Sequence, residues 1–232
     1  MRSLFPRLMI GWLVLGFLFW TWYILTRAFA YQLLYFYVWL GVLGIPFWRY
    51  RDWIAHWLRS WRAGNLQKFL LLGYGMVLLE EIIAALMNNL SEGFGVALLV
   101  QRVGQFWAFN ILAFTGFIVG WYLLLTQIRY GRVERFFLAG CWGLVAEGVI
   151  NSLFSNPLAT FFLAPLMIYT YGFILTPAML SLEEPETRTV SPPVRVILAF
   201  VVPLVFSILP LTVLFTLRGY FPGLFPPPDM LG

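Results

Sequence analysis

Five polar residues stand in otherwise apolar stretches of the chain, and their side chains are of the kinds that carry acid–base chemistry. Glu80 and Glu81 are adjacent, Asn110 stands alone, and Glu147 and Asn151 are four residues apart. A carboxylate can take a proton from a water molecule, and an amide can donate a hydrogen bond to a developing oxyanion. The set therefore indicates a candidate site for acid–base chemistry, provided that the fold brings the five side chains together.

The composition identifies the elements that must carry these residues. The chain has 232 residues, of which 61% are hydrophobic and only 11% are charged, whereas soluble domains carry about 25% charged residues. A helix of about 20 apolar residues crosses the hydrocarbon layer of a membrane and satisfies its own backbone hydrogen bonds there. We therefore expect an all-α, polytopic transmembrane helical bundle that forms a single membrane domain over residues 1–232.

Apolar runs predict about seven membrane spans. We expect them over residues 8–26, 30–47, 69–88, 105–127, 136–153, 158–180 and 196–217. If the N-terminus is cytoplasmic, twelve of the fifteen Lys and Arg residues fall in segments on the inside, as the positive-inside rule requires. This distribution predicts a multi-pass protein of the plasma (inner) membrane with its N-terminus in and its C-terminus out.

The segment 48–65 has a different pattern from a plain linker. Trp53, Trp57 and Trp61 are spaced four residues apart among several arginines. This spacing is typical of an amphipathic helix that lies in the cytoplasmic interface with its indoles at headgroup depth. The lipid bilayer is therefore the expected partner, and anionic lipid accounts for the net charge of +5 without a nucleic-acid partner.

This topology places the five polar residues in the outer half of the membrane, on three consecutive helices within residues 69–153. Glu147 and Asn151 would share a helical face, whereas Glu80 and Glu81 would point about 100° apart. A carboxylate inside the bilayer costs about 2.5–3.5 kcal/mol, so we expect relief from protonation, a cation or a water-filled cavity. The alternative is a network of protonated Glu and Asn side chains that only holds the helices together.

The chain offers few residues for a cofactor. Cys141 is the only cysteine and His56 the only histidine, which excludes a cysteine-based metal cluster and bis-histidine haem. Lys68, the only lysine, precedes the third span, so the last span cannot hold retinal through a Schiff base. The remaining ligands are all oxygen atoms, which suit a hard divalent cation better than zinc, and the identity of a metal is left open.

The three polar motifs resemble those of the CPBP membrane proteins, the CAAX-protease and bacteriocin-processing group. That family carries E-E-x-x-x-R, F-x-x-x-H and H-x-x-x-N on successive helices. The chain has E-E-I-I-A-A from residue 80, F-W-A-F-N from residue 106 and E-G-V-I-N from residue 147. Ala85 stands where the family has arginine, and Asn110 and Glu147 stand where it has histidines.

The resemblance implies an intramembrane peptidase and assigns roles to the five residues. Glu80 or Glu81 would be the general base for a water molecule, Glu147 and Asn151 would orient the water or a cation, and Asn110 would stabilise the oxyanion.

The three replaced family residues leave room for a second reading as a pseudoenzyme. The chain would then be a non-catalytic scaffold or assembly subunit with a membrane protein or peptide as its partner. The seven-span scaffold subunit of gamma-secretase is such a member of the same superfamily. A third reading is an ion-binding or transport protein that uses the carboxylate layer, although the sequence has no inverted repeat.

Overall fold

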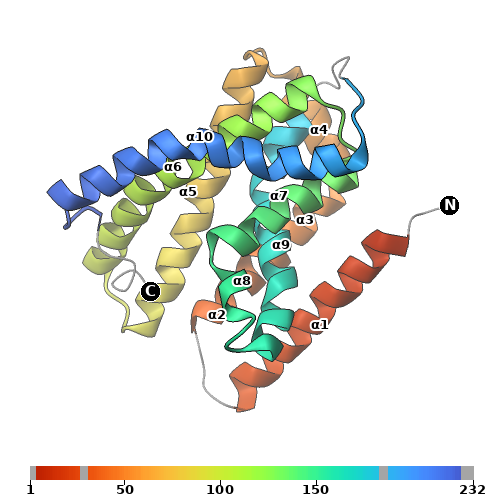
Figure 1. The fold of residues 1–232 in the computed structure, drawn as a ribbon. Coiled ribbons are helices and arrows are strands. Elements are labelled where there is room, and N and C mark those ends of the chain that lie inside the picture. The colour runs from red at the N-terminus through yellow and green to blue at the C-terminus, as the bar shows by residue number, and fades with distance from the viewer. Residues whose placement is uncertain (1–3, 27–30, 183–187, 226–232) are drawn as a thin grey trace.

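The structure is a computed structural model that describes residues 4–26, 31–182 and 188–225, and within these ranges it is built of helices without a strand (Figure 1). The helices are α1 (Leu4–Thr26), α2 (Tyr31–Phe36), the π-helix η1 (Tyr37–Gly44), α3 (Ile45–Arg49), α4 (Arg51–Ser60), α5 (Asn65–Ser91), α6 (Val96–Gln127), α7 (Arg132–Ala146), α8 (Val149–Ser152), α9 (Pro157–Ser181) and α10 (Pro192–Tyr220). The predicted all-α fold is confirmed.

Six helical segments in the described part of the chain are long and apolar enough to cross a membrane, one fewer than the seven predicted. They are α1, the continuous segment Tyr31–Arg49, α5, α6, α9 and α10. The chain is therefore a multi-pass integral membrane protein. The predicted start of the second span at residue 30 lies outside the described residues.

The predicted span 136–153 is wrong as an uninterrupted helix. Helix α7 ends at Ala146, and Gly148 has φ +63°, in the left-handed region. Glycine adopts this conformation without the steric cost of a side chain, and a single left-handed residue ends an α-helix. The chain resumes as the four-residue α8, so the break in this span falls directly after Glu147.

The broken pair α7–α8 nevertheless runs antiparallel alongside α9. A Cβ atom at Gly140 would lie 2.1 Å from the carbonyl oxygen of Ile168, and the hydroxyls of Ser152 and Thr160 lie 2.9 Å apart. The small residues of α7 thus allow close helix packing. The direction in which the chain enters the membrane stays a prediction.

Helix α10, in blue in Figure 1, crosses α6 at an equally close contact. A Cβ atom at Gly116 would lie 2.2 Å from the backbone nitrogen of Ser207, and one at Gly120 would lie 2.6 Å from the Cα of Pro203. The two glycines of the G-F-I-V-G stretch therefore serve helix packing. This contact packs one face of α6 against α10, while Asn110 of α6 contacts α5 through Glu81.

Helix α4 forms the central part of the predicted interfacial segment 48–65. Its tryptophans are exposed, at Trp53, Trp57 and, just beyond its end, Trp61. The Nε of Arg59 donates a hydrogen bond to the carbonyl oxygen of Leu180 at 3.1 Å, which holds α4 against the end of α9. The helix is amphipathic, and its position in the membrane interface stays a prediction.

Candidate functional site

The side chains of Glu80 and Glu81 project from neighbouring faces of α5 and contact different helices. The hydroxyl of Tyr35 on α2 donates a hydrogen bond to Oε1 of Glu80. The Nδ2 of Asn110 on α6 donates to Oε1 of Glu81 at 2.5 Å. The turn of about 100° between successive helical residues explains why adjacent side chains reach different partners. Glu81 is buried, and Glu80 is partly buried.

Two further contacts join α5 to α6, within two turns of the glutamates on the N-terminal side of α5. The indole Nε1 of Trp107 donates to the carbonyl oxygen of Leu78 at 3.0 Å, and the hydroxyls of Tyr74 and Thr115 lie 2.7 Å apart. The bond between Glu81 and Asn110 therefore lies within a helix pair whose register is set by its neighbours.

Glu147 is the residue that follows the last turn of α7, and its side chain is exposed. The hydroxyl of Tyr171, a buried residue of α9, donates a hydrogen bond to Oε1 of Glu147. Side chains on a helix lean towards its N-terminus, which is the direction in which Tyr171 must reach. Gly143 makes room, because a Cβ atom there would lie 2.4 Å from the Tyr171 ring.

The three carboxyl groups belong to one cluster. Glu147 lies close enough to interact electrostatically with both Glu80 and Glu81, and the adjacent pair interact with each other through their side chains. Tyr35 lies in electrostatic range of Glu80 and Glu81, and Tyr171 lies in range of all three glutamates. We call the three glutamates and their donors Tyr35, Asn110 and Tyr171 the carboxylate cluster. Four of the five predicted site residues thus come together.

Asn151, the fifth predicted residue, lies on α8 beyond the helix break and is exposed. Its backbone nitrogen donates to the carbonyl oxygen of Gly148 at 2.9 Å. The shared helical face expected for Glu147 and Asn151 requires a continuous helix, and the left-handed Gly148 removes it. Asn151 therefore lies at the edge of the site, while Glu147 belongs to the carboxylate cluster.

The tyrosine donors were missed by sequence reasoning. Tyr35 and Tyr171 are two of eleven tyrosines in the chain, and each lies in an apolar run without a distinguishing spacing. A buried Tyr hydroxyl needs a hydrogen-bond partner. The glutamates in the apolar segments were therefore the only sequence signal that a tyrosine donor lies nearby. A tyrosine cannot be assigned to a particular carboxylate before the helix packing is known.

The carboxylate cluster leaves the identity of a metal open. Across the described ranges, no group of three or more His, Cys, Asp or Glu side chains is placed to hold a metal ion. Each glutamate of the carboxylate cluster accepts a hydrogen bond at Oε1 from a Tyr or Asn side chain.

No family model, no curated protein and no solved structure matches the chain. The resemblance to the CPBP peptidases therefore rests on the three motifs themselves.

Proposed function

We propose that the chain is an intramembrane hydrolase of the plasma (inner) membrane, resembling the CPBP peptidases, that cleaves a peptide bond at the carboxylate cluster. The observation that carries the proposal is the exposure of Glu147 at the helix break, within electrostatic range of Glu80 and Glu81. An exposed carboxylate on a broken helix can meet both a water molecule and a substrate. A site with three buried carboxylates could meet neither.

In this mechanism Glu147 is the general base. It takes a proton from water as the water oxygen bonds to the carbonyl carbon of the substrate. Asn110 uses one Nδ2 proton on Glu81, and its second proton is available to the oxyanion. Glu147 then returns the proton to the leaving nitrogen, and the carbon–nitrogen bond breaks. Burial of Glu81 and its bond to Asn110 favour a positioning role for that residue, in place of the base expected from the sequence.

The proposal is tested by comparing the N-termini of membrane proteins in cells that carry the wild-type chain or Glu147→Gln. Free N-termini are labelled chemically and quantified by mass spectrometry. We expect a set of new N-termini in the wild type that is absent in Glu147→Gln. Glu92→Gln, which changes an exposed glutamate outside the carboxylate cluster, should keep the set. Identical N-termini in all three strains would contradict the proposal.

A non-catalytic scaffold is the second candidate, and one observation favours it. Each glutamate of the carboxylate cluster accepts a hydrogen bond from a neighbouring helix, which ties α2, α6 and α9 to α5 and α7. Hydrogen bonds of this kind hold transmembrane helices together. Under this candidate, Glu147→Gln leaves the N-termini unchanged but reduces the amount of a membrane protein that co-purifies. A chain that purifies alone from native membranes would argue against the scaffold.

A further inference from the structure

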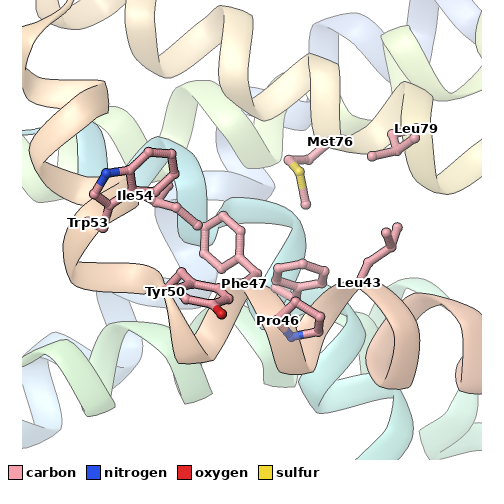
Figure 2. A pocket seen from close by; sticks show the side chains of 9 residues that line it. Leu43, Pro46, Phe47, Tyr50, Trp53, Ile54, Met76 and Leu79 are labelled. Carbon is pink, nitrogen blue, oxygen red and sulfur yellow. The ribbon is translucent and has the colours of Figure 1, made fainter.

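An apolar groove of about 680 Å³ separates the α3–α4 segment from α5. Figure 2 shows side chains from both walls facing this space. They include Leu43, Phe47, Tyr50, Trp53, Met76 and Leu79. The volume lies within the range of about 300–1,000 Å³ that small-molecule sites occupy.

Both walls of the groove are apolar. On α5 the lining consists of Met76 and Leu79, about one helical turn apart, and on the facing wall it includes Leu43 and Phe47. Nearer the start of α5, the Nζ of Lys68 donates to the carbonyl oxygen of Arg59 and holds the end of α4 against this helix. An apolar lining of this kind suits the methylene groups of an acyl chain.

The mouth of the groove, on the predicted cytoplasmic side, combines aromatic and basic residues. Tyr50 and Trp53 line the mouth and remain 60% and 68% exposed. Arg49 and Arg51 flank Tyr50, and both arginines are at least partly exposed. The ion pair of Arg51 with Asp52 is long, at 3.8 Å, and open to solvent, so it neutralises little of the positive charge.

We propose that this groove binds one anionic phospholipid, with an acyl chain along Leu43, Met76 and Leu79 and its phosphate at Arg49 and Arg51. The apolar walls account for the chain, and the basic mouth selects an anionic headgroup over a neutral one. Tyr50 and Trp53 lie at the level where aromatic side chains contact headgroups. The inference is independent of catalysis, because no glutamate of the carboxylate cluster lines the groove.

Native mass spectrometry of the purified full chain tests the proposal, with added phosphatidylglycerol or phosphatidylcholine of identical acyl chains. We expect the wild type to retain one phosphatidylglycerol about thirtyfold more tightly than phosphatidylcholine, an effect of the size expected for two basic contacts. The double variant Arg49→Gln with Arg51→Gln should lose this preference. Arg62→Gln, an exposed arginine away from the groove lining, should keep it.

The groove itself is tested by filling it. Met76→Trp should weaken phosphatidylglycerol retention by about tenfold, because the indole takes the place of acyl methylenes. Leu43→Trp fills the same space from the opposite wall. It replaces Met76→Trp in this experiment if Met76→Trp does not fold. Leu71→Trp, at an exposed position of the same helix, is the matched control and should bind normally.

Equal binding by the groove-filling variants and Leu71→Trp would overturn the proposal. So would equal retention of the two lipids by the wild type. A peptide that co-purifies with the wild type and is lost in Met76→Trp, while phosphatidylglycerol binding is unchanged, would assign the groove to a peptide and overturn the lipid assignment.

Discussion

The hydroxyl of Tyr171 donates a hydrogen bond to the carboxylate of Glu147, across the interface between α9 and the end of α7. The contact joins a buried tyrosine to the one exposed glutamate of the carboxylate cluster. It exists because Gly143 leaves space for the tyrosine ring and because the left-handed Gly148 ends the helix beside it. The hydrogen bond from Tyr171 therefore stabilises an acidic group within the helical bundle. The end of the helix leaves the same group exposed at the surface of the bundle.

Tyr171→Phe removes this donor and should destabilise the protein by about 1–2 kcal/mol. A hydrogen bond to a charged group contributes about 1.5–3 kcal/mol in soluble proteins, whereas side-chain bonds in membranes average about 0.6 kcal/mol. Thermal unfolding in one detergent measures the change. Tyr169→Phe, on the same helix, is the control, and an equal melting temperature for the two variants would contradict the prediction.

Gly116→Ala should destabilise the contact between α6 and α10 by about 1–3 kcal/mol, the usual cost of overpacking. The added methyl group would lie 2.2 Å from the backbone of Ser207, which cannot move as a flexible side chain could. Gly104→Ala, on the same helix, meets no atom within 4 Å and should be neutral or slightly stabilising. Chemical denaturation of the two variants side by side measures the difference, and similar losses would refute this account of the packing.

The connection between α6 and α7 predicts a pH effect. The Tyr130 hydroxyl donates to the carbonyl oxygen of Arg195 at 3.0 Å. Burial, helped by the nearby Glu134 carboxylate and opposed by Arg195, raises the pKa of Tyr130 from 10.0 to about 12. Because the folded state holds the proton more tightly, its contribution to stability is complete below pH 10 and is lost as the pH rises towards 12.

The melting temperatures of the wild type and Tyr130→Phe should therefore converge between about pH 10 and 12. Tyr220→Phe, at an exposed position, controls for the general effect of alkaline pH. A difference between the wild type and Tyr130→Phe that stays constant over this range would show that Tyr130 is not linked to folding.

The sequence predicted the apolar segments well because membrane spans are set by length and composition. It also placed Glu81 and Asn110 on adjacent helices at matching depth in the membrane. In the structure, the two side chains form a hydrogen bond. Both predictions follow from regular helix geometry, which converts a residue number directly into a height in the membrane.

Departures from regular geometry could not be predicted in the same way. Gly148 has no feature in the sequence that distinguishes it from the other glycines, and its left-handed conformation separates Glu147 from Asn151. The π-helix between Tyr37 and Gly44 likewise has no signature in that apolar run. Tyr35 and Tyr171 were missed because hydrogen-bond partners between helices depend on packing, which hydropathy does not contain.

Water access at position 147 tests the central claim most directly. Cys141 is the only cysteine, so Cys141→Ser gives a background for single cysteines. In intact cells, a membrane-impermeant maleimide should label Glu147→Cys at a rate near that of Phe154→Cys, where the native side chain is 90% exposed. It should not label Ala85→Cys, which is fully buried. If Glu147→Cys is as protected as Ala85→Cys, no water reaches the carboxylate cluster and the proposed hydrolysis is contradicted.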